Sequence, residues 1–517
     1  MYNKFLSTFG TLKFLKVVPV FVVLALGAWA YASPIGSSPD DDFHLTSIWC
    51  AQPAADEICA EGTSEITRTV PAILIQAPCY AYKAEQSAQC IDKIGYSVQP
   101  SILTDRGNFA GGYPPVFYAV MNVFAGNDVQ ISILIMRFIN ILLFAGLMTV
   151  TFIALPSNRR GTLAWSWLVT SIPLGSFLIA SNNPSSWAII GVGMSWVAFL
   201  GFLETTGRRK GILALLTLLA ILIAAGSRAD AAVYSLLGLG AVLLLKWRKS
   251  MFRWSIVGLV AAAVLVCGYF YFTSTQAVSA INGFGNPVTA VGGFGGAVEN
   301  ISTDKPSTFA LLAFNILNAP MLWEGFFGSW GLGWLDTDLP SIVYLGSLAA
   351  FVAMAFLGFG NLNKRKFLAL SGIGLALWIL PVYVLTKGGS HIGMEVQPRY
   401  LLPLAVLFAG VLLLKVRERE LRLTRGQAYL IALTLSLANF VALHFNMRRY
   451  ITGIDSMGWN LNQDIEWWWP GFVSPMTVLF IGSAAFACVV FVIAREVNLD
   501  GKPTTAANAK KALVING

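Results

Sequence analysis

Long apolar runs recur along this chain, and they constrain its fold more than any other feature. A helix needs roughly 17–25 predominantly apolar residues to cross about 30 Å of hydrocarbon. About twelve such runs are present, near 15–33, 131–153, 162–181, 184–203, 211–227, 229–246, 254–273, 339–358, 367–386, 399–415, 427–445 and 474–494. Because backbone polar groups inside a bilayer must be satisfied internally, we expect these runs to be helices. The predicted fold class is an all-α integral membrane protein with about twelve transmembrane helices.

The composition supports a membrane fold and excludes the soluble alternatives. Hydrophobic residues make up 56% of the 517 residues and charged residues only 12%, whereas soluble proteins carry about 25% charged residues. With a mean hydropathy of +0.66, the chain has more apolar surface than a compact soluble core can remove from water. A soluble enzyme, a coiled coil, a collagen-like chain and a disordered chain are therefore excluded.

The formal net charge of +9 could indicate a nucleic-acid partner, so its distribution matters. Most Lys and Arg residues lie at the N-terminus or in alternate connections between the runs, beginning with Lys4, Lys13 and Lys16. Positive residues concentrate on the cytoplasmic side of membrane proteins, and no stripe of basic residues interleaved with aromatics is present. We therefore interpret the charge as a topology signal, with both termini cytoplasmic and no nucleic-acid partner.

The first apolar run has two interpretations. Ala30-Tyr31-Ala32 is similar to the end of a secretory signal peptide, which would be removed by cleavage. We favour an uncleaved anchor, because the polar motif that follows it has to be held at the membrane surface.

The connections between the runs are unequal in length, which divides the chain into membrane segments and two large outside loops. The predicted organisation is a cytoplasmic N-terminus with the first span (1–33), a first extracytoplasmic loop (34–130), spans two to seven (131–273), a fourth extracytoplasmic loop (274–338), spans eight to twelve (339–494) and a disordered cytoplasmic tail (495–517). Within the fourth loop, the glycine-rich segment 282–296 is predicted to be mobile. No nucleotide-binding motif occurs on the cytoplasmic side, so the protein is expected to work at its outside face.

Four of the six cysteines lie in the first outside loop, at Cys50, Cys59, Cys79 and Cys90. Their grouping indicates two disulfides in an oxidising compartment. Three pairings are open, of which Cys50–Cys59 with Cys79–Cys90 is the most local. A zinc site is the alternative, although no CxxC or His spacing supports it.

An acidic motif, Ser38-Pro39-Asp40-Asp41-Asp42-Phe43-His44, follows the first span. Adjacent carboxylates repel one another, which raises at least one pKa and favours a shared proton or a bound cation. A carboxylate held above a bilayer can serve as general base toward a hydroxyl group. His44 is a candidate metal ligand, so a divalent cation is an open option. The alternative is a solvated acidic run that caps a helix.

This motif resembles the PDExxH-type motif of a bacterial membrane-protein family of unknown function, which looks like a branch of the GT-C glycosyltransferases. Three further stretches fit the same family pattern in the same order: GYPPVFY at 112–118, GLGWLDTDLP at 331–340 and VQPRYLLP at 396–403. Asp41 stands where the family usually has Glu, and Pro398 interrupts a common Gln-Gly-Arg-Tyr sequence. The resemblance covers most of the chain and implies a GT-C-like fold in the bacterial plasma membrane with a polyprenyl-phosphate-linked sugar donor.

The resemblance and the high energy of charges in a membrane together select the candidate site residues. Asp40 is predicted to be the general base, and Asp41 to help place the acceptor or a cation. Arginine binds phosphate oxygens bidentately, so Arg399 is predicted to bind the donor phosphate and to face Asp40. The other candidates are Arg228 and Tyr400 for the donor, and His44, Tyr113, Trp334 and Asp336 for the acceptor or sugar. For Arg228, an ion pair with Asp230 is an equal alternative.

Two classes of function follow. The first is an inverting membrane glycosyltransferase that moves a sugar from a polyprenyl-phosphate donor to a hydroxyl of a cell-envelope glycan, glycolipid or protein. The second is a flippase for a lipid-linked sugar, with Arg137, Arg228 and Asp230 along its pathway, or else a non-catalytic assembly subunit. The two halves of the chain show no matching broken helices, which disfavours a transporter.

Overall fold

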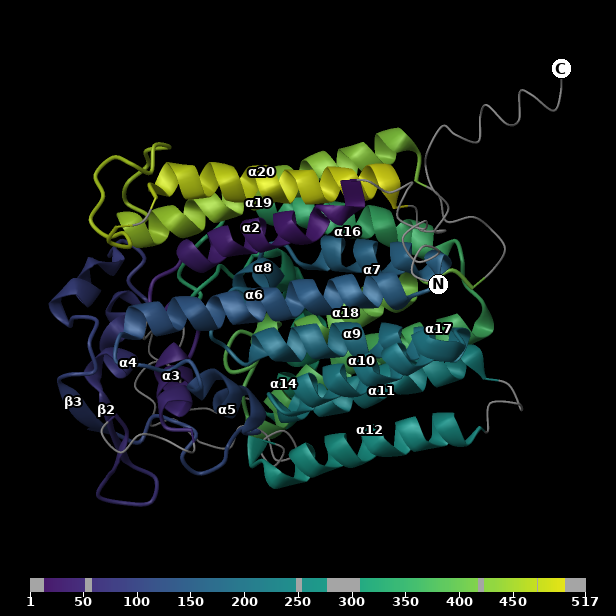
Figure 1. Ribbon diagram of the computed structural model, residues 1–517, viewed down its shortest axis with the longest axis horizontal. Coiled ribbons are helices and arrows are strands. Elements are labelled where there is room, and N and C mark those ends of the chain that lie inside the picture. Colours follow the sequence, from purple (N-terminus) through teal and green to yellow (C-terminus); the bar gives the residue numbers. More distant parts are fainter. Residues whose placement is uncertain are drawn as a thin grey trace.

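The protein is a bundle of long, roughly parallel helices with a small irregular domain at one end (Figure 1). The computed structural model describes residues 14–51, 58–247, 253–276, 307–416, 423–471 and 473–497. The glycine-rich segment 282–296, Lys4, Lys13 and the predicted tail from 498 onward lie outside the described residues. The all-α membrane prediction is confirmed in its general form.

Within the described part of the chain, twelve helices that each match a predicted span, or the larger part of one, make up most of the bundle. In chain order they are α2 (Val18–Tyr31), α6 (Val129–Ala154), α7 (Ser157–Thr170), α9 (Ser185–Glu204), α10 (Gly207–Ala225), α11 (Ala229–Lys246), α12 (Trp254–Thr273), α16 (Ser341–Phe359), α17 (Lys364–Gly388), α18 (Pro398–Leu412), α19 (Arg425–Ile451) and α20 (Pro475–Glu496). A short 3-10 helix, η1 (Phe14–Lys16), precedes α2.

Nine helical stretches in the described part of the chain are long and apolar enough to cross a membrane. Eight of them coincide with predicted spans. The ninth, Thr308–Phe327, comprises α14 (Thr308–Asn318), α15 (Pro320–Glu324) and η5 (Gly325–Phe327), and it falls in the predicted loop 274–338. The protein is therefore a multi-pass membrane protein, and the count of twelve spans stays a prediction.

The remaining predicted spans depart from a simple crossing helix for identifiable reasons. With 14 and 15 residues, α2 and α18 are only about 21–23 Å long at 1.5 Å per residue. The helix α10 begins with three consecutive cations, Arg208, Arg209 and Lys210. The predicted span 162–181 is divided into α7 and α8 (Leu174–Ile179), because Pro173 has no N–H with which to continue the first helix.

One end of the bundle, which we call the loop end, carries the loop domain, residues 33–128 (Figure 1). This domain contains α3 (Asp41–Trp49), α4 (Ala72–Gln76), η2 (Ala77–Tyr80), η3 (Ala88–Lys93), α5 (Val116–Asn122) and an antiparallel sheet of β1 (Ala60–Glu61), β2 (Arg68–Pro71) and β3 (Ser101–Thr104) in the order β1-β2-β3. Arg68 lies opposite Glu61 on one side and Thr104 on the other. The two predicted disulfides are confirmed, and of the three open pairings the structure has the most local one, with Cα separations of 5.4 Å for Cys50–Cys59 and 6.2 Å for Cys79–Cys90.

Arg137 of α6 fixes the place where α2 leaves the bundle and enters the loop domain. Its side chain is buried and donates hydrogen bonds to the carbonyl oxygens of Ala30 (2.8 Å) and Pro34 (2.7 Å), and also to that of Ser33. Carbonyls at a helix C-terminus have no partner within the helix. Arg137 therefore braces the junction between α2 and the loop domain.

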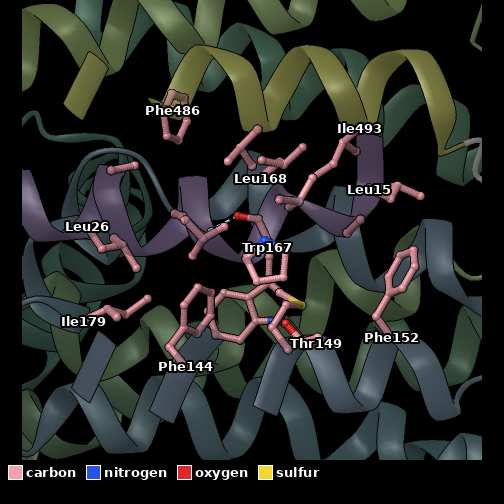
Figure 2. Close-up of a pocket in the computed structure, with 18 of the residues that line it drawn as sticks. Leu15, Leu26, Phe144, Thr149, Phe152, Trp167, Leu168, Ile179, Phe486 and Ile493 are labelled. Atoms are coloured by element: carbon pink, nitrogen blue, oxygen red, sulfur yellow. Dashed lines mark hydrogen bonds between the residues drawn. The ribbon is translucent and has the colours of Figure 1, made fainter. Parts of the chain in front are cut away.

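A mostly apolar cavity of about 460 Å³ lies between α2, α6, α7 and α20 (Figure 2). It extends from Leu26 and Ile179, toward the loop end, to Leu15 and Phe152, toward the opposite end of the bundle.

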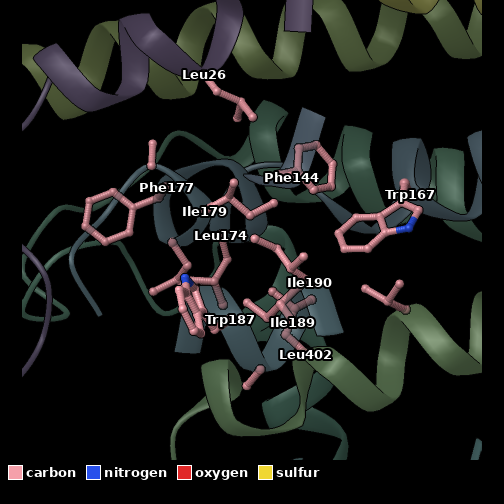
Figure 3. Close-up of a cluster of buried hydrophobic side chains, with 14 of the residues drawn as sticks. Leu26, Phe144, Trp167, Leu174, Phe177, Ile179, Trp187, Ile189, Ile190 and Leu402 are labelled. Atoms are coloured by element: carbon pink, nitrogen blue, oxygen red, sulfur yellow. The ribbon is translucent and has the colours of Figure 1, made fainter. Parts of the chain in front are cut away.

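The helix ends that build the loop end are held by one cluster of buried side chains (Figure 3). Phe177 of α8, Trp187 of α9 and Leu402 of α18 all belong to it. The indole N–H of Trp187 donates to the Asn140 side-chain oxygen of α6 at 2.8 Å. This packing fixes the first turns of α9 and α18 relative to each other.

The contact between α9 and α10 gives a direct test of this packing. A Cβ at Gly191 would lie 2.4 Å from the Ala220 oxygen and 2.6 Å from the Ala224 nitrogen, both backbone atoms of α10. We expect Gly191→Ala to separate the two helices and to lower the free energy of unfolding by about 1–3 kcal/mol, measured by thermal unfolding in detergent. Gly240→Ala is the matched control, because a Cβ at this helical glycine meets nothing within 4 Å. Equal melting temperatures for the two variants would contradict the packing.

Candidate functional site

The acidic motif forms a tight turn between α2 and α3, with Asp40 as the residue that precedes α3. Asp40 has a φ of +61°, a left-handed conformation that non-glycine residues rarely adopt and that Asn and Asp tolerate best. The Ser38 N–H donates to the Asp41 carboxylate at 3.0 Å and closes the turn. Asn183, just before α9, donates its side-chain N–H to the Pro39 carbonyl at 2.9 Å. These two hydrogen bonds therefore stabilise the strained conformation of the turn.

Arg399, in the first turn of α18, contacts this turn directly. Its Nη2 lies 2.5 Å from Asp40 Oδ2, and its Nη1 donates to the Pro39 carbonyl at 2.9 Å. Only 4% of the Arg399 side chain is exposed, against 32% for Asp40. The two residues are 359 positions apart in the sequence, and they face each other at the loop end as the sequence analysis expected.

A second arginine, Arg106, holds the other side of the acidic motif, and the sequence analysis did not identify it. Its Nη2 lies 3.1 Å from Asp40 Oδ1, and its Nε donates to Asp42 Oδ2 at 2.8 Å. Arg106 lies in the loop domain, after β3, and its side chain is 44% exposed. An arginine in the same outside loop as three adjacent carboxylates was the signal available in the sequence.

The surroundings of Asp40 and Asp41 shift the pKa values of their carboxyl groups in opposite directions. Burial would raise the pKa of Asp40, but the positive charges of Arg399 and Arg106, together with the hydrogen bond from Arg399, outweigh it, and the pKa falls to about 2. Burial raises the pKa of Asp41 to about 7, against the opposing effects of Arg137 and the Ser38 N–H. Asp40 is therefore ionised at neutral pH and partly exposed, whereas Asp41 is 1% exposed. The burial of Asp41 favours a role in positioning the turn over contact with an acceptor.

Tyr400 lies between two guanidinium groups. The Cζ atoms of Arg228 and Arg399 are 4.5 Å and 4.9 Å from its ring centroid, and its hydroxyl oxygen accepts a hydrogen bond from Arg399 Nη2 at 2.9 Å. Arg228, just before α11, forms a bidentate ion pair with Asp230, at 3.0 Å and 2.8 Å. The predicted donor residues Arg228, Arg399 and Tyr400 are thus brought together next to Asp40.

His44 and Tyr113 are also close to this group, within a cluster of aromatic rings. His44 Nδ1 is 2.9 Å from the hydroxyl oxygen of Tyr118, and its ring packs edge-to-face against Tyr113 at 5.5 Å. Burial holds the pKa of His44 well below its usual range, against the attraction of Asp40, so the imidazole is neutral. Burial also raises the pKa of Tyr113 to about 12. His44 therefore supports the wall of the site as a neutral ring.

The other two candidates, Trp334 and Asp336, occupy a separate position. The loop 331–340 packs against the chain just before the acidic motif, where the Trp334 indole N–H donates to the Gly36 carbonyl at 2.8 Å. Asp336 accepts from Arg449 Nη2 at 2.7 Å and from the Tyr82 backbone N–H at 3.0 Å. Because the Arg449 and Asp336 side chains are 0% and 8% exposed, this ion pair docks the loop onto α19 and the loop domain.

The charged group at the loop end can accept a proton and bind an anion. It presents one partly exposed, ionised carboxylate beside two guanidinium groups and a tyrosine hydroxyl. Within the described residues, no group of three or more His, Cys, Asp or Glu side chains has the arrangement of a metal site. Instead, arginines occupy the carboxylates that a cation would need.

Fold and site together define a multi-pass helical membrane protein with a charged site at one end of the bundle. A family model described as Predicted membrane protein (DUF2142) matches residues 22–408, a range that contains all four sequence motifs. The chain belongs to this family of membrane proteins of unknown function. No curated protein and no solved structure matches the chain.

The different placements of the two acidic residues in the loop 331–340 generate a prediction. Asp336→Asn removes the charge that balances buried Arg449, and we expect a loss of stability on the order of 3 kcal/mol, seen as a lower melting temperature in detergent. Asp338→Asn changes the same kind of side chain at an exposed position and should melt like the wild type. Unchanged melting of the Asp336 variant would mean that the ion pair does not dock the loop.

Proposed function

We propose that the protein is a membrane glycosyltransferase of the GT-C type that uses a polyprenyl-phosphate-linked sugar. The observation that carries the proposal is the contact of 2.5 Å between Arg399 and Asp40. An arginine that can bind phosphate and a carboxylate that can accept a proton then lie side by side at the start of α18. Transfer from a lipid phosphate to a hydroxyl needs both groups at that boundary.

The donor phosphate is proposed to bind at Arg399, Tyr400 and Arg228. The Arg399 guanidinium is shared between Asp40, the Pro39 carbonyl and the Tyr400 hydroxyl. Its Nε is buried and has no hydrogen-bond partner among the described residues. A phosphate can satisfy this N–H together with a neighbouring one, since arginine binds phosphate through two parallel N–H groups. The lipid chain would then extend into the bilayer.

Binding of the donor also changes Asp40. A carboxylate with a pKa near 2 is a weak proton acceptor, because efficient general bases have a pKa close to the working pH. A phosphate bound to Arg399 offsets the positive charge that lowers the pKa of Asp40 most strongly, so the pKa of Asp40 rises. The base would therefore become active when the donor is bound.

The proposed reaction is a single displacement at the anomeric carbon. The acceptor hydroxyl oxygen forms the new bond to that carbon, its proton passes to Asp40, and the bond from the carbon to the phosphate oxygen breaks. The polyprenyl phosphate leaves with its electron pair, held by the arginines, and the anomeric configuration is inverted. The acceptor is a hydroxyl of a cell-envelope glycan, glycolipid or protein.

The site is proposed to face the outside of the bacterial plasma membrane. Both disulfides lie in the loop domain, next to the site, and disulfides persist in oxidising compartments. The basic N-terminus and connections support the same orientation, since they belong on the cytoplasmic side. A flippase is less well supported, because Arg137 binds backbone carbonyls and Arg228 binds Asp230.

Asp40→Asn tests the base. Asn tolerates the left-handed backbone at this position and keeps the shape of the side chain, so the variant should fold while its turnover falls about 10²- to 10⁴-fold. The assay is formation of a labelled glycosidic product from polyprenyl-phosphate sugar in proteoliposomes. Asp105→Asn, at an exposed position of the same loop, is the control and should keep its activity. Normal turnover of folded Asp40→Asn, or transfer of the labelled lipid across the membrane without any product, would refute the proposal.

An Arg399 series tests the phosphate site separately. Lys keeps the charge but loses the two-pronged contact, and Ala loses both, so donor affinity should fall in the order Arg, Lys, Ala. A charge-assisted hydrogen bond contributes about 1.5–3 kcal/mol, or roughly ten- to a hundredfold in affinity. Arg106→Ala removes the other arginine from Asp40 and should leave donor affinity nearly unchanged. Equal losses for Arg106→Ala and Arg399→Ala would show that the affinity depends on Asp40 rather than on a phosphate contact.

A further inference from the structure

The apolar cavity between α2, α6, α7 and α20 has a positively charged end. Lys16, Arg160 and Arg209 line it where α2, α7 and α10 begin, far from the acidic motif. The rest of the lining is almost entirely aliphatic and aromatic, and it contains no Asp or Glu. The volume of about 460 Å³ lies within the range of roughly 300–1,000 Å³ that is usual for ligand sites.

Two of these cations lack a balancing carboxylate in the cavity. Arg160 donates one hydrogen bond to the Ile153 carbonyl at 3.1 Å and lies over the Phe152 ring. Its Nε is buried without a hydrogen-bond partner among the described residues. Arg209, in the first turn of α10, is close enough for its charge to act on Arg160. A phosphate between the two guanidinium groups would relieve this repulsion and satisfy the buried N–H.

A second unpartnered N–H group lies deeper in the cavity. The ring of Trp167 forms part of the cavity wall (Figure 2), its side chain is 3% exposed, and its Nε1–H has no hydrogen-bond partner among the described residues. Trp167 follows Arg160 by seven residues on α7, about 10 Å along the helix at 1.5 Å per residue. A ligand with an anionic head and a hydrogen-bond acceptor just below it would satisfy both groups.

We propose that this cavity binds an anionic glycerophospholipid. Its phosphate lies between Arg160 and Arg209, an acyl chain follows the apolar wall toward Leu26, and an ester carbonyl accepts the Trp167 N–H. Basic pockets between transmembrane helices are known to hold such head groups. An isoprenoid phosphate has no ester carbonyl to offer Trp167. The bound lipid would brace α2, whose far end leads into the acidic motif, so the site is separate from that of the proposed donor.

The test measures lipid binding to the full-length protein purified in a neutral detergent, by native mass spectrometry with added lipid. Phosphatidylglycerol should bind more tightly than phosphatidylcholine with the same chains, and polyprenyl phosphate should not displace it. Arg160→Gln with Arg209→Gln should lower the affinity for phosphatidylglycerol tenfold or more. Arg208→Gln, a neighbouring exposed arginine that does not line the cavity, is the matched control and should bind as the wild type does.

Variants of Trp167 test the proposed hydrogen bond to the lipid ester independently of the arginines. Trp167→Phe keeps an aromatic ring but removes the N–H, so it should bind ester-linked phosphatidylglycerol several-fold more weakly and leave binding of the ether-linked lipid unchanged. Ala164→Phe, which fills the cavity, should abolish binding of both lipids. Equal affinities for phosphatidylglycerol and phosphatidylcholine would overturn the proposal, as would an unaffected double arginine variant. Displacement by polyprenyl phosphate would assign the cavity to an isoprenoid instead.

Discussion

The ion pair between Arg399 and Asp40 joins the two parts of the molecule on which the site depends. Asp40 belongs to the turn that follows the first membrane helix, and Arg399 opens a short, buried helix in the second half of the chain. Their contact fixes the loop domain to the bundle at the point where the chain leaves its apolar surroundings. The strained backbone of Asp40 persists because Arg399 and Asn183 both hold the neighbouring Pro39 carbonyl.

The buried arginines of this protein differ in their hydrogen-bond partners, and this difference distinguishes the arginines that stabilise the fold from the one in the proposed site. Arg137 binds backbone carbonyls, and Arg449 binds Asp336 together with the Tyr80 carbonyl. Both of these arginines are enclosed, so their contacts brace the fold. Arg399 is equally buried, but its carboxylate partner is about one-third exposed. An incoming anion can compete for Arg399 there, which is why the proposed chemistry centres on this pair.

Much of the site was accessible to sequence reasoning, since four of its predicted members, Asp40, Arg228, Arg399 and Tyr400, lie together. The order of the motifs suggested this, because the family pattern groups residues that a helical bundle can bring to one end. Arg106 was missed because it belongs to no motif and meets Asp40 and Asp42 only in the folded structure. Asp336 was assigned to the acceptor because it lies in a motif of the family pattern, and the motif gives no sign of the arginine that pairs with it. That arginine, Arg449, is 113 residues away.

The sequence by itself determined the membrane class and the positions of most helices, because both follow from hydrophobicity along a short segment. It left three cysteine pairings open, of which the structure selects the most local one. It did not reveal the helical stretch Thr308–Phe327, whose polar residues Asn315 and Glu324 lower its hydropathy. In the structure, Asn315 is buried against the Thr386 hydroxyl and the Ser390 carbonyl. Only the tertiary structure decided which charged side chains form ion pairs. Ion pairs such as Arg399–Asp40 depend on distances between segments hundreds of residues apart, and packing of the whole bundle sets those distances.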